Sequence, residues 1–197
     1  RRYFTLARPL AATLDNGGTV SITFHGMATA IYVWLNGTFV GYGEDGFTPN
    51  EFDITEALNV DGDNVLTVAC YEYASASWLE DQDFWRLHGL FRSVELAAQP
   101  HVHIEDMKVE ADWNPETATG SLDALLAVRN AKNAATVSAT LKDLSGNVVW
   151  ETALAASDET GIVSGSLDVK PWSAESPALY ELQVVVIGHD GAIVETA

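Results

Sequence analysis

The sequence predicts an all-β protein with two domains, and three features of its 197 residues support this. Apolar and polar side chains alternate with the period of two that is typical of strands. Turn-forming residues separate the alternating runs. No long stretch shows the 3.6-residue period of an amphipathic helix. The runs lie at 20–24, 31–35, 102–104, 122–128, 137–141 and 182–186, and turn signals occur at 16–18, 36–37, 61–62, 145–146 and 190–191.

The pair Asn36-Gly37 is the sharpest turn signal in the first half of the chain. Both residues tolerate a positive φ, so they suit a two-residue type I′ hairpin between strands at 31–35 and 38–42. With Thr38 they also form an N-glycosylation sequon. We prefer the hairpin interpretation, because it explains these residues without a sugar.

Evidence for helices is limited to 53–58, where Asp53 or Thr55 could cap a single turn. We therefore expect helix to be confined to short turns. Trp34 and Phe52 lie within the strand and turn signatures of the first half. We expect both of these side chains to be largely buried there.

A domain boundary is predicted at Gln99-Pro100, giving domains at 1–99 and 100–197. The residue before a proline prefers an extended backbone, and a proline cannot donate a hydrogen bond within a central strand. About seven short strands follow in roughly 100 residues, which is typical of an immunoglobulin-like sandwich. The absence of a cysteine pair excludes only the disulfide-bonded variety.

Composition excludes several classes of partner. The 28 acidic and 10 basic side chains give a net charge of −18, which repels nucleic acid and anionic membranes. No apolar run reaches the length of a membrane span. The single cysteine, Cys70, alternates with Leu66 and Val68, so we expect it to be a small buried hydrophobe. One cysteine permits no intramolecular disulfide, and we expect a cytoplasmic protein.

The most polar stretch, 77–94, concentrates the groups that carbohydrate chemistry requires. It contains three carboxylates, two tryptophans, two arginines and a histidine, at Glu80, Asp81, Asp83, Trp78, Trp85, Arg86, Arg92 and His88. Glycosidases need two neighbouring carboxylates, and sugar sites combine aromatic faces with polar groups. Composition alone leaves three interpretations open, namely a catalytic site, a binding site, or a loop held by arginine–carboxylate pairs.

The remaining histidines give weaker signals. His88 alone is more typical of a structural hydrogen-bonding group than of a base or ligand. His101 and His103 lie two residues apart on one face of an expected strand and could form half of a metal site. No third ligand is evident in the sequence, so we favour an ordinary strand face.

Several motifs resemble family 2 glycoside hydrolases of the β-galactosidase type, and the resemblance covers nearly the whole chain. Three segments resemble the family's sugar-binding jelly-roll domain, at 33–43, 49–55 and 64–68. The run Glu80-Asp81-Gln82-Asp83-Phe84-Trp85-Arg86, followed by Gly89-Leu90-Phe91-Arg92-Ser93-Val94, resembles the signature of the β-galactosidase branch. Residues 171–180 resemble the end of the family's immunoglobulin-like second domain. The resemblance implies a jelly-roll (galactose-binding-like) β-sandwich followed by an immunoglobulin-like β-sandwich.

The same resemblance implies roles for the polar loop. Asp83 matches an aspartate that contacts galactosyl hydroxyls and a sodium ion, and a hard carboxylate suits both. Asp81 is a weaker candidate for substrate binding. Trp85, Arg86 and Arg92 are expected to support the loop. His88 replaces a small polar residue of the family, so the resemblance gives it no role.

The resemblance places both catalytic glutamates on a (β/α)₈ barrel that follows the second domain, and this chain has no such pattern. No catalytic residue is therefore assigned to the chain, and no cofactor is expected to bind it tightly. Magnesium, where the parent enzyme uses it, would bind elsewhere. The family also has a substrate-contacting asparagine before the first matched strand, which implies a jelly roll truncated at its N-terminus.

The leading interpretation is the non-catalytic N-terminal part of a β-galactosidase-type enzyme. Its partners would be a β-galactoside, the barrel of the same parent chain and, in a homo-oligomer, further copies. The alternative is a stand-alone carbohydrate-binding β-sandwich protein, which would bind galactosides by itself. A structural or adhesion protein is a third class, and it leaves the run from Glu80 to Arg92 without a purpose.

Overall fold

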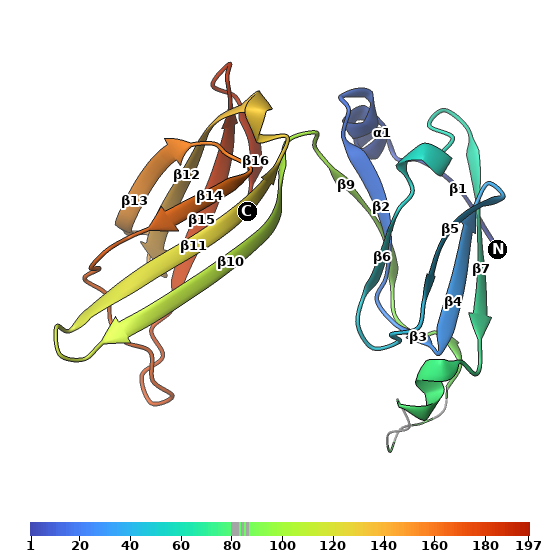
Figure 1. The fold of residues 1–197 in the computed structure, drawn as a ribbon, viewed down its shortest axis with the longest axis horizontal. Coiled ribbons are helices and arrows are strands. Elements are labelled where there is room, and N and C mark those ends of the chain that lie inside the picture. The colour runs from blue at the N-terminus through green and yellow to red at the C-terminus, as the bar shows by residue number, and fades with distance from the viewer. Residues whose placement is uncertain (80–82, 84, 86) are drawn as a thin grey trace. The chain divides into compact units, whose positions relative to one another are not determined.

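The computed structural model describes residues 1–79, 83, 85 and 87–197. The chain divides into two compact units, Arg1–Pro100 and His101–Ala197, and each is built of strands (Figure 1). Among the described residues, no helix is long and apolar enough to cross a membrane.

The first unit is a sandwich of two antiparallel sheets with a small strand pair at one end (Figure 1). One sheet has the order β1-β7-β4-β5, and the other has the order β6-β2-β9. The third is the pair β3-β8. The strand bounds in chain order are β1 Arg2–Thr5, β2 Thr19–Phe24, β3 Met27–Ala28, β4 Ala30–Leu35, β5 Thr38–Gly43, β6 Asn50–Asp53, β7 Asp63–Tyr71, β8 Gly89–Leu90 and β9 Val94–Gln99.

The core of this unit fills the space between the two larger sheets. Alternate residues of β2 and β4 point inward, and Phe24, Ile31 and Leu35 are fully buried. Phe52 on β6 is partly buried and packs edge-on against Phe24, with ring centroids 6.1 Å apart. Trp34 is also only partly buried. The burial expected for Trp34 and Phe52 is therefore incomplete, since the alternation that directs Ile31 and Leu35 inward turns Trp34 to the opposite face.

The hairpin between β4 and β5 forms as the sequence predicts. Asn36 and Gly37 have φ values of 53° and 85°, as a type I′ turn requires. The Asn36 side chain accepts a hydrogen bond from the Val65 backbone N–H at 2.8 Å and donates to the Ala57 carbonyl at 2.8 Å. These contacts tie the turn to β7 and to the neighbouring loop.

One α-helix, α1 at Arg8–Asp15, was not expected from the sequence. Its two turns begin with Pro9 near the N-terminus, where a proline is tolerated, and no side chain caps that end. The described residues also form 3₁₀ turns, η1 at Thr55–Ala57, η2 at Ser75–Trp78 and η3 at Ala131–Asn133. The turn predicted at 53–58 is confirmed as η1, and Asp53 accepts from the Thr55 N–H at 2.8 Å.

The second unit is a second sandwich, with sheets of order β10-β11-β14 and β13-β12-β15-β16. Leu126, Val137 and Val184 come from the two sheets and are almost fully buried in its main core. The all-β prediction of a jelly-roll sandwich followed by an immunoglobulin-like sandwich is confirmed. The strand bounds are β10 His103–Asn114, β11 Thr119–Arg129, β12 Ala134–Asp143, β13 Val148–Ala155, β14 Glu159–Val163, β15 Tyr180–Gly188 and β16 Ile193–Thr196.

Candidate functional site

The polar motif of the sequence lies in a long connection of the first unit, residues 72–93, which we call the site loop. It leaves β7, passes through η2 and β8, and ends at β9. The pairing of β8 with β3 anchors its returning arm, with Leu90 opposite Met27 and Gly89 opposite Ala28. Gly89 has a φ of 99°, which favours glycine at the point where the loop turns into β8.

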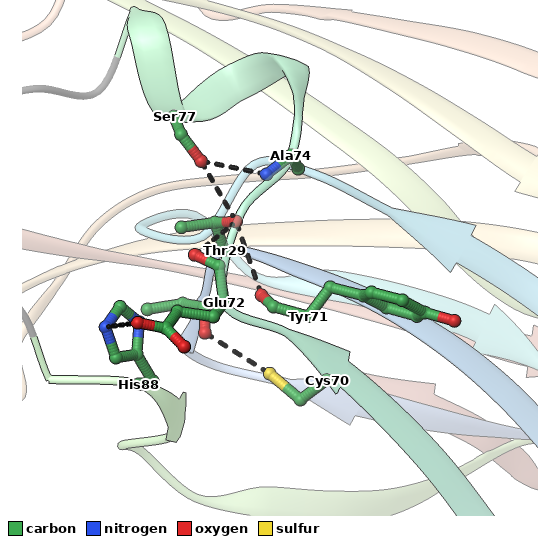
Figure 2. Close-up of polar contacts among 8 residues, drawn as sticks. Thr29, Cys70, Tyr71, Glu72, Ala74, Ser77 and His88 are labelled. Carbon is green, nitrogen blue, oxygen red and sulfur yellow. Dashed lines mark hydrogen bonds and ion pairs between the residues drawn. The ribbon is translucent and has the colours of Figure 1, made fainter.

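A contact between a histidine and a glutamate joins the two arms of the site loop at its base. The Nε2 of His88 lies 3.1 Å from Oε1 of Glu72, and Figure 2 shows the two side chains facing each other. Their side chains are 37% and 54% exposed, so solvent weakens the attraction. No sequence motif pairs these two residues, because it is the return of the loop that brings them together. The expectation of a structural role for His88 agrees with this contact.

Thr29 provides a second anchor under the outgoing arm of the loop (Figure 2). Its backbone N–H donates to the Tyr71 carbonyl at 2.7 Å. Its hydroxyl accepts from the Ser77 hydroxyl at 3.3 Å, and Ser77 in turn accepts from the Ala74 N–H at 2.9 Å. Cys70 is partly buried beside this cluster, and its thiol lies 3.4 Å from the Ala28 carbonyl. The base of the loop is therefore hydrogen-bonded to the sandwich.

Arg92 fixes the returning arm from the other side. Its guanidinium donates to the Phe47 carbonyl at 3.1 Å and to the His25 carbonyl at 3.3 Å. The same group lies 5.5 Å from the centre of the Phe91 ring, within cation–π distance. Phe91 also contacts Phe47, with centroids 5.7 Å apart. Arg92 thus links the end of the loop to two other segments of the first unit.

The tip of the loop carries the predicted site residue Asp83, whose side chain is exposed. Trp85 is 88% exposed, so in this chain its ring does not pack against the sandwich as a support would. Asp81 and Arg86 lie outside the described residues, as does Glu80. Trp78, Leu79 and Leu87 are also highly exposed, at 88%, 86% and 67%. The sequence pattern singles out Trp78 and Trp85 as aromatic groups, but it gives no role to Leu79 and Leu87, which flank the acids on either side.

The described residues do not by themselves form a metal centre. They contain no group of three histidine, cysteine, aspartate or glutamate side chains that could hold an ion. His103 is nearly buried and contacts Glu105 at 3.1 Å, and the ring of His101 contacts Asn133 at 3.2 Å. Both histidines therefore have protein partners. For a sodium ion at the loop tip, Asp83 could supply one carboxylate ligand, and the other ligands would have to come from elsewhere.

The protein is therefore a tandem β-sandwich. Its first sandwich carries a loop with a hydrogen-bonded base, and this loop exposes the carboxylate of Asp83 and the rings of Trp78 and Trp85. Residues 9–100 match the family described as "Glycosyl hydrolases family 2, sugar binding domain", and residues 102–197 match "Glycosyl hydrolases family 2". The chain belongs to glycosyl hydrolase family 2.

Similar proteins agree with that assignment. The chain is 59% identical to the β-galactosidase BgaC of Bifidobacterium adolescentis over its whole length, which is 20% of that protein. It is 47% identical to a β-galactosidase of Streptococcus thermophilus, covering 88% of this chain and 17% of that protein. The chain thus spans about a fifth of the length of these curated relatives.

Solved structures give the same fold. An FMN-binding β-glucuronidase from Facaelibacterium prausnitzii L2-6 superposes with a TM-score of 0.83 at 25% identity, covering 99% of this chain and 30% of that one. A β-glucuronidase from Bacteroides uniformis superposes with a TM-score of 0.80 at 20% identity, covering 100% of this chain and 25% of that one. At that identity the second likeness concerns the fold alone.

Proposed function

We propose that this chain is the non-catalytic N-terminal part of a β-galactosidase-type glycoside hydrolase that cleaves terminal β-galactosides. The observation that carries the proposal is the tip of the site loop, where Trp78, Leu79, Trp85 and Leu87 expose large apolar side chains on either side of Asp83 in the sequence. Large apolar side chains exposed in this way are typical of a place where another part of a protein packs. The high identity to β-galactosidases about five times longer supports the same proposal.

In this proposal Asp83 reaches into the substrate site of the parent enzyme. Its carboxylate would accept hydrogen bonds from galactosyl hydroxyls and supply one ligand to a sodium ion. Its exposure on a loop with a fixed base supports such a role, because the group is presented outward and needs no sandwich contact. Asp81 is proposed as a second, weaker contact to substrate. Magnesium is assigned to no residue of this chain.

Arg92, Trp85 and Arg86 are proposed to support the loop. The bonds from Arg92 to two carbonyl groups, at 3.1 and 3.3 Å, favour this role for Arg92. For Trp85, support would come from packing against the rest of the parent enzyme, since the ring is exposed in this chain.

The partners of the chain follow from the same proposal. They are the β-galactoside substrate, the catalytic (β/α)₈ barrel of the parent chain and, in a homo-oligomer, other copies of the parent. We propose independent domains at 1–99 and 100–197, which is supported by the clustering of contacts within Arg1–Pro100 and His101–Ala197. A cytoplasmic location is proposed because Cys70 alone leaves no intramolecular disulfide to form.

The 197-residue chain is expected to show no turnover of a chromogenic β-galactoside. Retaining hydrolysis needs two carboxyl groups about 5–5.5 Å apart around an enclosed sugar. The run from Glu80 to Asp83 lacks the barrel that would enclose the sugar and orient the bond. The measurement is absorbance above the rate of a heat-denatured sample. Turnover that disappears on substituting Glu80, Asp81 or Asp83 would contradict the proposal, as would a coding sequence without a barrel after Ala197.

A stand-alone carbohydrate-binding protein remains the second candidate function. It is favoured by a separate observation, a group of aromatic side chains on strands β4, β5 and β7 of the first unit. Direct binding of sugar by the chain would support it, whereas a structural or adhesion protein predicts neither binding nor a barrel.

A further inference from the structure

Five aromatic side chains lie together on the outer face of the sheet β1-β7-β4-β5, and we call them the aromatic platform. Tyr32 is at their centre. Its ring centroid lies 4.6 Å from that of Tyr42, 5.5 Å from Tyr71, 6.1 Å from Trp34 and 6.4 Å from Phe39. The platform spans strands β4, β5 and β7, so it stands on hydrogen-bonded backbone.

The platform faces away from the core. Ile31, Val33 and Leu35 are fully buried on the inner side of β4, and the residues between them project from the other side. Four of the five platform rings keep between 36% and 54% of their surface exposed, although they also contact one another. In Figure 2 the Tyr71 ring extends away from the polar contacts at the base of the site loop.

A fixed carboxylate borders the platform. Tyr42 donates its hydroxyl hydrogen to Glu44, and the Ser75 hydroxyl lies 2.7 and 2.8 Å from the two oxygens of the same carboxylate. The bond to Glu44 raises the pKa of Tyr42 to about 12, and the bonds from Tyr42 and Ser75 lower the pKa of Glu44. The Ala76 backbone N–H is a third donor to this carboxylate, so Glu44 is an ionised acceptor at neutral pH with about one lone-pair site left for a further donor.

We propose that the aromatic platform binds a neutral β-galactooligosaccharide, with C–H faces of the sugar rings against Tyr32 and its neighbours and a sugar hydroxyl donating to Glu44. Pyranose rings are suited to such a surface because each presents both an apolar C–H face and a rim of hydroxyl donors. The tyrosine hydroxyls add further hydrogen-bonding groups along the same strands.

The chemistry of the platform selects this ligand over two others. Nucleic-acid bases also stack on aromatic rings, but they need cations for the phosphates. Strands β4, β5 and β7 contain no lysine or arginine, and the whole chain carries a net charge of −18. Protein interfaces enrich methionine and arginine alongside aromatic residues, and neither occurs among the five platform residues or in these three strands.

This inference deepens the second candidate function, sugar binding by the chain itself, and rests on it; it does not depend on the role proposed for Asp83. The platform residues are not part of the site loop tip, and sugar binding here needs no barrel. Failure of the binding experiment would therefore leave the role of Asp83 in the parent enzyme untouched, and an inactive parent would leave the platform untouched.

The test is isothermal titration calorimetry of the 197-residue chain with β-1,4-galactotetraose. We expect a Kd on the order of 0.1–1 mM, as suits a shallow open surface. A tetramer of galacturonic acid is the matched anionic probe, and it should bind at least tenfold more weakly because it meets Glu44 and the negative chain. No binding of galactotetraose at about 10 mM would overturn the proposal.

Tyr32→Thr locates the binding, because threonine suits a strand and removes the central ring. We expect at least tenfold weaker binding, whereas Trp172→Thr, which removes an exposed aromatic ring of the second unit, should change Kd less than twofold. If Tyr32→Thr fails to fold by circular dichroism, Tyr71→Thr at the platform's margin replaces it. Unchanged binding in the folded platform variant would overturn the assignment, as would a dimer that this variant dissociates while sugar does not bind.

Discussion

Both units of the molecule contain a long connection, and the two connections use their apolar residues in opposite ways. In the second unit, residues 164–179 join β14 to β15, and Leu167 is 5% exposed in a core cluster with Leu122 and Leu141. In the first unit, the site loop is fixed at its base by polar contacts and exposes Trp78 and its neighbours at the tip.

This difference shows that, in a β-sandwich, some connections stabilise the fold and others are free to serve a function. The connection at 164–179 is part of the fold, because Gly120 and Leu167 exchange two backbone hydrogen bonds at 3.0 and 2.8 Å and the Leu167 side chain is buried. Among the described residues at the tip of the site loop, Trp78, Leu79, Trp85 and Leu87 are highly exposed, so these side chains are available to whatever packs on them. Substitutions in the connection at 164–179 of the second unit should change stability. Substitutions at the tip of the site loop in the first unit should change activity.

The largest expected effect is a loss of stability when the connection at 164–179 of the second unit is changed. Leu167→Ala removes a buried side chain and leaves a cavity, which costs about 2–5 kcal/mol of unfolding free energy. Leu79→Ala is the matched control, since this side chain is 86% exposed at the site loop and should change stability by less than about 0.5 kcal/mol. Chemical denaturation of the 197-residue chain measures both. Equal losses would show that the two connections do not differ as described.

A smaller effect, on activity, is expected from Asp83→Asn in the parent enzyme. An amide accepts hydrogen bonds at one atom where a carboxylate accepts at two. Losing one charge-assisted bond costs about 1.5–3 kcal/mol, or roughly ten- to a hundredfold in kcat/KM. Melting temperature should hardly change, because the side chain is exposed.

Asp81→Asn serves as the control for that experiment, with a smaller expected loss of kcat/KM. A variant at Asp83 that melts at a clearly lower temperature while keeping its kcat/KM would mean that the residue is structural. The proposed substrate role would then be wrong.

The sequence predicts the elements of the fold better than it predicts the contacts of the candidate site. The Asn36-Gly37 hairpin was predictable because its φ requirements are local. Helix α1 was missed because eight residues without a side-chain cap carry little signal beyond Pro9. Trp34 was expected to be buried from its motif, although alternation with Ile31 and Val33 already placed it on the outer face.

The candidate site shows the same contrast between local signals, which the sequence contains, and long-range contacts, which it does not. Resemblance to the family identifies Asp83 as a site residue, but it does not show which groups the side chain contacts. The pair formed by Glu72 and His88 spans sixteen positions in the sequence and depends on where the loop returns, so no periodicity or motif could indicate it. The two backbone contacts of Arg92 were equally hidden, because carbonyl acceptors carry no sequence signal.

A modest effect is expected when the base of the site loop is unpaired. His88→Ala removes the partner of Glu72, and we expect amide hydrogen exchange in 72–79 to accelerate by about two- to fivefold, because an exposed pair contributes about 0–1 kcal/mol. His88→Gln retains a donor and should recover most of the protection. His189→Ala removes a histidine that contacts the Lys132 carbonyl in the second unit and should leave exchange in 72–79 unchanged. Unchanged exchange in His88→Ala would show that the pair does not hold the loop.

The smallest expected effect concerns the pH dependence of the second unit's stability. Glu105 accepts a hydrogen bond from Nη2 of Arg129 at 3.1 Å, forms an ion pair with Nε of the same guanidinium at 3.1 Å, and lies 3.1 Å from the nearly buried His103. Arg129, and then His103, lower the pKa of the Glu105 carboxyl. A lowered pKa stabilises the fold above the unfolded value, near 4.3, and the benefit disappears as pH falls through the lower folded value. Because the side chain is 42% exposed, the contribution is small.

Glu105→Gln should therefore lower the melting temperature at pH 7 by a few degrees at most, and the difference from the unsubstituted chain should narrow as pH falls below about 4.3. Glu110→Gln is the matched control, since Glu110 pairs at 2.8 Å with Lys108 while both side chains are about two-thirds exposed. That variant should melt with the unsubstituted chain at every pH, because an ion pair so exposed contributes little. Calorimetric scans between pH 3 and pH 7 make the measurement, with roughly half-unit steps around the unfolded carboxyl pKa. A gap for Glu105→Gln that widens on acidification would reverse the sign required by the lowered pKa, and would mean that Arg129 and His103 do not stabilise the ionised carboxylate in the folded chain.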